Sequence, residues 1–303
     1  MDIFIQQIIN GVVLGSIYAL VALGYTMVYG ILELINFAHG EVTMFGAMVA
    51  LTVIGALMGL HPALPGLVVV LGGVLVAIPA CMLLGFGIEK VAYRPLRHAP
   101  RLAPLITAIG MSIILQNAAM LIWGRQYVSF PPLLPRGHHA ILGATITDLQ
   151  IFIVGLSLLI MGGLWLLVEK TKLGRAMRAT AQSREVAQLM GVNVDRVISA
   201  TFIIGSALAA IAGVMVSAYY GLAHYYMGFM LGLKAFSAAV LGGIGNIAGA
   251  MLGGLLLGVI EALGAGYIGD PTFIANLDTF GSNSRACCLM PTQSNLTWQC
   301  ISS

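Results

Sequence analysis

Long runs of apolar residues separated by short polar segments dominate this 303-residue sequence. Because a helix of about 20 apolar residues is long enough to cross a bilayer, each long run is a candidate membrane span. The runs cover residues 8–29, 42–60, 66–88, 104–123, 149–168, 197–219 and 235–263. The pattern therefore predicts an all-α fold, a polytopic integral membrane helix bundle with about seven spans.

The composition supports a membrane location and close helix packing. Hydrophobic residues make up 59% of the chain and charged residues only 8%, whereas soluble domains carry about 25% charged residues. Small residues recur at intervals of four within several runs, which favours close approach of helix backbones in lipid. The glycines predicted to pack helices are Gly11, Gly15, Gly205, Gly213, Gly245, Gly249 and Gly253. For the segment 243–249 (GIGNIAG) a helix-breaking role is an open alternative to helix packing.

Four polar residues in or beside the apolar runs are candidates for a transport pathway or gate. Asn36, His39 and Glu41 lie in the polar interruption 33–41, where a structural role at the membrane interface is favoured over a functional one. Glu261 stands near the end of the last apolar run, either as a helix-end carboxylate or as a gate residue. None of these side chains has the spacing of a zinc site, so no metal is expected.

Basic residues predict the orientation of the bundle. They concentrate in two polar loops, 89–103 and 169–196, and Lys and Arg favour cytoplasmic loops. Counting spans back from these loops places the N-terminus outside, and taking 235–263 as one crossing places the C-terminal tail inside. Residues 1–269 are thus predicted to form the membrane domain. Residues 270–303 form an atypical polar tail, expected to be disordered or to result from a change of reading frame.

The apolar runs lack an evident energy source for transport. Carriers driven by ions usually place ionisable groups at mid-membrane, and most of these runs contain none. The chain also lacks the glycine-rich phosphate loop of an ATPase, so we expect no cofactor on this chain and an ATPase partner that uses ATP. A passive channel or facilitator remains an alternative. An intramembrane enzyme is disfavoured because no nucleophile or metal set stands out.

The most polar segment between two spans, 174–191, is the predicted contact for that ATPase. Residues 185–191 (EVAQLMG) resemble the EAA loop of ABC-transporter permeases, which marks a short coupling helix. A helix over 175–191 would present an apolar edge able to enter a groove, and glycine at its end would stop it. The candidate coupling residues are Arg175, Arg178, Arg184, Glu185, Ala187 and Gly191.

Four further motifs resemble the LivH-type permease of branched-chain amino acid importers. They occupy residues 36–41 (NFAHGE), 93–97 (YRPLR), 105–116 and 239–246, and the similarity extends to about residue 269. The resemblance implies a non-enzymatic, multi-pass subunit of a bacterial inner membrane. Its implied partners are a second, LivM-like permease, two ABC ATPase subunits and a periplasmic amino-acid-binding protein, with no nucleic acid.

The same resemblance implies leucine, isoleucine and valine as cargo, although related permeases serve urea and short amides. Family members continue with one more apolar span after the point where this chain has its polar tail. Substrate selection is expected to rest mostly with the binding protein, because passage through a permease needs weak contacts.

Overall fold

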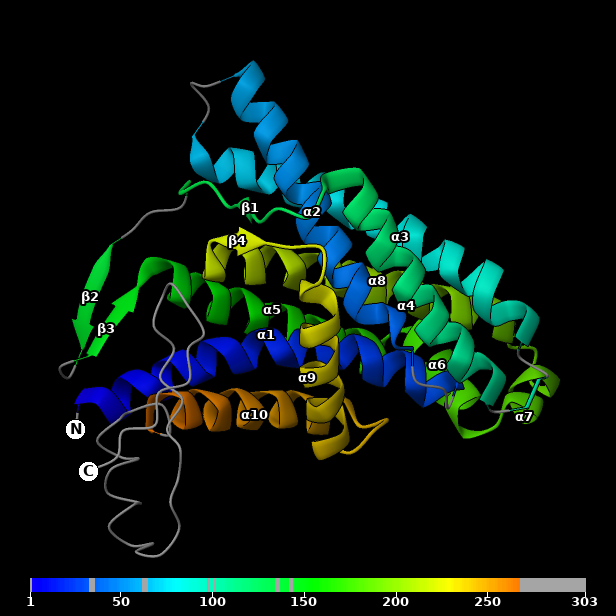
Figure 1. Ribbon diagram of the computed structural model, residues 1–303. Coiled ribbons are helices and arrows are strands. Elements are labelled where there is room, and N and C mark those ends of the chain that lie inside the picture. Colours follow the sequence, from blue (N-terminus) through cyan, green and yellow to red (C-terminus); the bar gives the residue numbers. More distant parts are fainter. Residues whose placement is uncertain are drawn as a thin grey trace, which may run out of the picture.

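A computed structural model describes residues 2–32, 36–61, 65–96, 99–100, 102–133, 137–141 and 144–267. The predicted tail at residues 270–303 lies outside these ranges, as does the position of any further span. Within them, helices account for nearly all of the regular structure (Figure 1).

Seven of the described helices are long and apolar enough to cross a membrane, which confirms the predicted fold class and span number. They are α1 (Asp2–Leu32), α2 (Ala38–Leu60), α3 (Gly66–Ile88), α4 (Leu102–Trp123), α5 (Asp148–Lys170), α8 (Val194–Tyr220) and α10 (Ile247–Tyr267). Three shorter α-helices are α6 (Lys172–Gln182), α7 (Arg184–Leu189) and α9 (Met227–Leu241). The first basic loop is partly helical, because α3 continues through a π turn (Glu89–Tyr93) and a 3-10 turn (Arg94–Leu96).

Two small antiparallel strand pairs join the spans. Strand β1 (Val128–Ser129) pairs with β4 (Leu222–Ala223), and β2 (His138–Ile141) pairs with β3 (Ala144–Thr147). The first pair ties the segment after α4 to the segment after α8.

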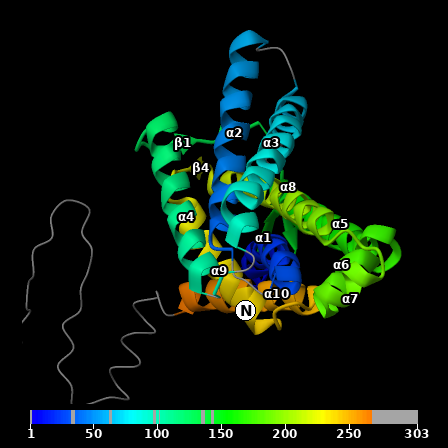
Figure 2. The same cartoon turned by 90° about the vertical axis from the view of Figure 1, so that its right-hand side faces the viewer.

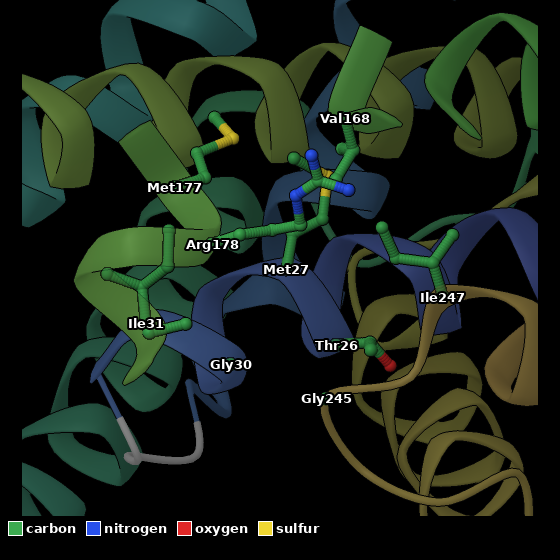
Figure 3. Close-up of a pocket in the computed structure, with 10 residues that line it drawn as sticks. Thr26, Met27, Gly30, Ile31, Val168, Met177, Arg178, Gly245 and Ile247 are labelled. Atoms are coloured by element: carbon green, nitrogen blue, oxygen red, sulfur yellow. The ribbon is translucent and has the colours of Figure 1, made fainter. Parts of the chain in front are cut away.

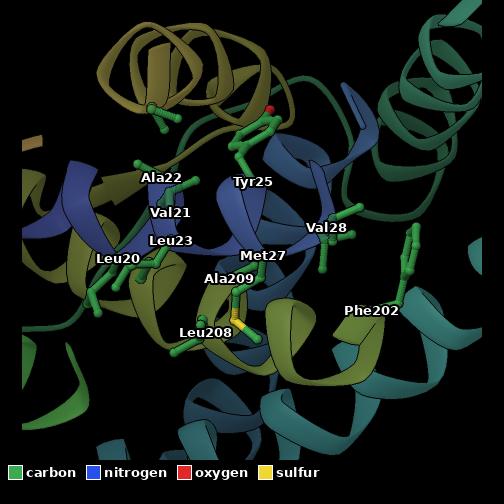
Figure 4. Close-up of a cluster of buried hydrophobic side chains, with 14 of the residues drawn as sticks. Leu20, Val21, Ala22, Leu23, Tyr25, Met27, Val28, Phe202, Leu208 and Ala209 are labelled. Carbon is green, nitrogen blue, oxygen red and sulfur yellow. The ribbon is translucent and has the colours of Figure 1, made fainter. Parts of the chain in front are cut away.

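Helix α1 forms the centre of the bundle. It is apolar on all sides, as expected of a helix that is buried all round, and it packs against α5, α8, α9 and α10. Figure 2 shows α1 nearly end-on among these helices. Its residues 20–23 are fully buried, and in Figure 4 Leu20 and Leu23 lie on the side of Leu208 and Ala209 of α8.

Glycines allow the closest helix crossings in the bundle. A Cβ atom added to Gly15 of α1 would lie 2.7 Å from the Cα atom of Leu255 in α10, and one added to Gly11 would lie 2.6 Å from that of Val259. A Cβ atom added to Gly213 of α8 would lie only 2.0 Å from the carbonyl oxygen of Thr43 in α2. Gly205, Gly249 and Gly253 also face neighbouring helices or turns, Gly205 at ordinary contact distance.

The predicted single span over residues 235–263 is wrong. Helix α9 ends at Leu241 and α10 begins at Ile247. Between them Gly243 and Gly245 have φ angles of +86° and +94°, a conformation that favours glycine. Gly245 therefore lies in the break between two helices and not on a packing ridge. Asn246 then caps α10, because its Oδ1 atom accepts a hydrogen bond from the Gly249 amide at 3.2 Å.

Because α9 and α10 are separate helices, the described chain finishes at the other end of the bundle from the one that a single span over 235–263 would give. Both basic segments lie at one end, where Arg94 forms an ion pair with Asp195 at 3.0 Å. The N-terminus lies at the other end (Figure 1), and the space beside Gly266 is filled by the Gln7 side chain. Since α10 runs antiparallel to α1, Tyr267 lies at the same end as the N-terminus. The predicted opposite placement of the two ends is therefore wrong for the described chain.

Candidate functional site

The predicted coupling helix over 175–191 is two helices and not one. Backbone at Ser183 is extended, with φ −161° and ψ 118°, and separates α6 from α7. The Ser183 hydroxyl accepts a hydrogen bond from the Val186 amide at 3.3 Å and so caps α7. Serine thus both breaks the first helix and starts the second, a local signal that the apolar pattern alone did not show.

Helix α7 presents an apolar tip. Ala187 is buried and holds the helix against the bundle, whereas Val186, Leu189 and Met190 are 57%, 87% and 80% exposed. Gly191 ends α7 with a φ angle of +81°, and the Val192 amide donates to the Ala187 carbonyl at 3.0 Å, as in a glycine-terminated helix. The tip is therefore fixed in shape although it is exposed.

Arg184 links α7 to the central helix. Its Nε and Nη2 atoms donate to the carbonyl oxygen of Ile31 at 3.2 and 2.9 Å. That carbonyl belongs to the last turn of α1, and the carbonyl groups in the last turn of a helix have no N–H partner within the helix. Displacement of α7 would consequently act on α1, the helix at the centre of the bundle.

The other candidate coupling residues surround this link. Arg178 pairs with Glu169 at the end of α5, whereas Arg175 and Glu185 are exposed. Arg178 also lines a small cavity of about 70 Å³ that extends from α1 to the α9–α10 break (Figure 3). The cavity at this end of the bundle is thus bounded by α1, α5, α6 and the glycine break.

A buried polar cluster lies between α2 and α4. Glu41 of α2 is fully buried and accepts hydrogen bonds from the Ser112 hydroxyl at 3.0 Å and from Gln116 Nε2 at 2.7 Å. Its second oxygen, Oε2, accepts none from any residue that the structure describes. Gly228 of α9 packs against this oxygen, since a Cβ atom there would lie 2.7 Å from it.

Asn36 and His39 extend the cluster toward α1. Asn36 Oδ1 accepts hydrogen bonds from the Ala38 amide at 3.1 Å and from the Tyr93 hydroxyl at 2.8 Å. The His39 ring fills the space beside Gly24 and meets the Tyr25 ring edge-on, with centroids 4.9 Å apart.

These residues are buried inside the bundle, and the interfacial position predicted for His39 and Glu41 stays a prediction. Gly24 lies eight residues before the end of α1 at Leu32, which at 1.5 Å per residue is about 12 Å along the helix. Asn36, His39 and Glu41 are all buried, and the last two belong to the first turn of α2. Polar composition alone did not indicate this burial, because it does not show that α4 supplies partners.

Replacing Glu41 with leucine should destabilise the protein, whereas replacing it with glutamine should be tolerated. Leucine removes the acceptor shared by Ser112 and Gln116, and a buried polar group left unpaired costs about 1–3 kcal/mol. Glutamine keeps a carbonyl oxygen at the same place. The apparent melting temperature of the detergent-solubilised protein measures both effects. Leucine at the exposed Glu185 is the control, and equal melting temperatures for the two leucine variants would contradict the role assigned to Glu41.

Glu261 is neither unpaired nor at a helix end. Its Oε1 atom lies 2.5 Å from Nζ of Lys234 in α9, and the same ammonium group lies 3.4 Å from the Tyr18 hydroxyl of α1. A single continuous helix over 235–263 does not bring Lys234 and Tyr18 to this carboxylate, so their pairing was not predicted.

Comparison with known proteins shows extensive similarity to transport permeases. The family described as the permease component of branched-chain amino acid transport systems matches residues 7–280. The chain is 49% identical over 271 residues to the high-affinity branched-chain amino acid transport system permease protein LivH of Escherichia coli K12, covering 88% of this chain and 87% of the relative. It is also 49% identical over 274 residues to the corresponding protein BraD of Pseudomonas aeruginosa, covering 88% of each.

More distant similarity reaches other organisms and another cargo. A probable LivH of Methanocaldococcus jannaschii is 28% identical over 88% of this chain and 83% of its own length. The xylose transport system permease protein XylH of E. coli is 33% identical over 39% of this chain and 31% of its own length. No solved structure matches.

Proposed function

We propose the function of this chain from one premise: it belongs to the family of permease components of branched-chain amino acid transport systems. The protein is a multi-pass membrane permease, and its proposed cargo is leucine, isoleucine and valine. The observation that supports this choice of cargo is the 49% identity to LivH and BraD over 88% of the chain. Similarity to the xylose permease covers less than half of the chain and supports a shared architecture for import.

The proposed complex contains this chain, a second LivM-like permease and two ABC ATPases, and it receives cargo from a periplasmic binding protein. The exposed apolar tip of α7 supports contact with an ATPase, because an apolar helix edge of this kind fits a groove on a partner. ATP would be bound and hydrolysed by the ATPase subunits. The link from Arg184 to the end of α1 would then carry their movement into the bundle.

The proposed orientation places α6 and α7 in the cytoplasm of a bacterium, with the protein in its inner membrane. The basic residues near α6 and α7 support it, since positive charge favours cytoplasmic loops. In that orientation the N-terminus and Tyr267 face the periplasm, where the binding protein delivers cargo.

Uptake by cells tests this function. A strain without other leucine importers would receive the genes of the complete complex, either with or without the gene for this chain. We expect uptake of labelled leucine, isoleucine and valine only when this chain is present, because the second permease alone would lack half of the pathway. Equal uptake in the two strains, or restoration of urea uptake alone, would contradict the proposal.

A further inference from the structure

A pocket beside the middle of α1 combines an apolar lining with Lys234, one member of an ion pair. It has a volume of about 200 Å³ and lies between α1, α8 and α9, on the side of the bundle where α8 ends. Its polar lining includes Lys234 and Tyr18, and its apolar lining includes Val216, Met230 and Leu231. Since Tyr18 is at mid-length of α1, the pocket lies partway between the two ends of the bundle, on the route that cargo would take in the proposed function.

Lys234 of this pocket forms a partly accessible ion pair with Glu261 of α10, which lies behind it. Lys234 Nζ lies 2.5 Å from Glu261 Oε1, and the two side chains are 42% and 32% exposed. The ammonium group also lies 5.7 Å from the centre of the Tyr18 ring. Ionisable residues inside a membrane protein are costly and generally mark a pathway or site, whereas an ion pair of this kind is weak support for stability.

We propose that this pocket is a transient binding site for the cargo amino acid as a zwitterion. The cargo carboxylate would replace Glu261 as the partner of Lys234, and the cargo ammonium group would bind Glu261 and the Tyr18 hydroxyl. The cargo carboxylate thereby takes the place of the Glu261 carboxylate at Lys234, and the cargo ammonium group takes the place of the Lys234 ammonium group at Glu261. Each charged side chain therefore keeps a partner of opposite charge. This inference rests on the proposed function, which supplies the amino acid.

The lining and the size of the pocket suit a branched aliphatic side chain. An apolar cavity of about 150 Å³ accepts benzene, and leucine is somewhat larger than benzene. Methionine side chains adapt to ligands of different shape, and the lining contains Met227 and Met230. The site would therefore accept leucine, isoleucine and valine alike while it requires both charged groups of the amino acid.

Photolabelling of the assembled complex tests this site. The complex in lipid nanodiscs would be irradiated with a leucine analogue that carries a diazirine, and the adducts would be mapped by mass spectrometry. We expect adducts on the pocket face of α8 and α9, near Tyr220, Met227 and Met230. Excess leucine should compete with them. Leucinol, which lacks the carboxylate, and 4-methylpentanoate, which lacks the ammonium group, should not compete.

Variants at the ion pair complete the test. Lys234→Met and Glu261→Gln should each lower the labelling that excess leucine can displace about tenfold. A tenfold loss of affinity corresponds to about 1.4 kcal/mol of binding free energy. Lys90→Met is the matched control, because Lys90 also lies over an aromatic ring, Phe86, but belongs to the turn after α3. Labelling of α8 and α9 that leucine does not compete, or that survives Lys234→Met unchanged, would overturn the site.

The same complex reconstituted into sealed proteoliposomes separates failure of the site from failure of the proposed function, because both labelling and uptake can be measured there. Leucine uptake driven by ATP, without competed labelling at α8 and α9, would overturn the site and leave the function intact. Competed labelling without leucine uptake would support the site and count against the function.

Discussion

Replacing Leu189 and Met190 together with aspartate is expected to abolish leucine uptake and to release the ATPase subunits from the permease. These side chains are 87% and 80% exposed and form most of the apolar tip of α7. If each contributes about 1.4 kcal/mol to the contact, the double variant binds the ATPase about 100-fold more weakly. Co-purification of the ATPase with the tagged permease measures binding, and labelled leucine measures uptake.

The control exchanges the same two side chains while it keeps the surface apolar. Leu189→Met with Met190→Leu conserves the volume of the tip, and such swaps are usually tolerated. The aspartate variant should still insert into the membrane with unchanged yield, because both positions point away from the bundle. Full co-purification of the ATPase with the aspartate variant would contradict the docking role of α7.

Replacing Gly213 with alanine is expected to reduce the stability of the folded bundle severely. The added Cβ atom would lie 2.0 Å from the carbonyl oxygen of Thr43 and 3.1 Å from the amide nitrogen of Ala47. Both are backbone atoms of α2, so relief requires that two helices move apart. Overpacking costs about 1–3 kcal/mol or more, and the resulting loss is measured as the apparent melting temperature in detergent.

Gly162 of α5 provides the matched control. Outside its own helix backbone, no described atom lies within 4 Å of a Cβ atom added there. Alanine at this position should be neutral or should gain up to about 1 kcal/mol from its higher helix propensity. If the two alanine variants melt at the same temperature, close packing of α2 and α8 does not limit stability.

The apolar pattern predicted most of the membrane fold, because span length and apolarity are local properties of the chain. It failed between Leu241 and Ile247, where apolar residues continue through a change of direction. The backbone there depends on the positive φ angles of Gly243 and Gly245, and hydropathy does not record a backbone angle. Because the pattern joined α9 and α10 into one span, it also placed the end of the described chain opposite the N-terminus, whereas the structure places both at the same end.

The candidate site was only partly predictable. Residues near Glu185 and Gly191 follow a local motif, so the sequence predicts a coupling segment there, although it joined two helices into one. The partners of Glu41 and Glu261 come from α4 and α9, far along the chain. Such pairings depend on how the helices assemble, and a single sequence gives no direct sign of them.

Transport by the purified complex in proteoliposomes tests the central claim most directly. The chain would be reconstituted with its second permease and two ATPases, with ATP enclosed on the side of α7 and loaded binding protein outside. The account predicts that labelled leucine accumulates above its external concentration, and only when ATP and the binding protein are both present. Equilibration of leucine without ATP, as through a passive channel, would contradict it.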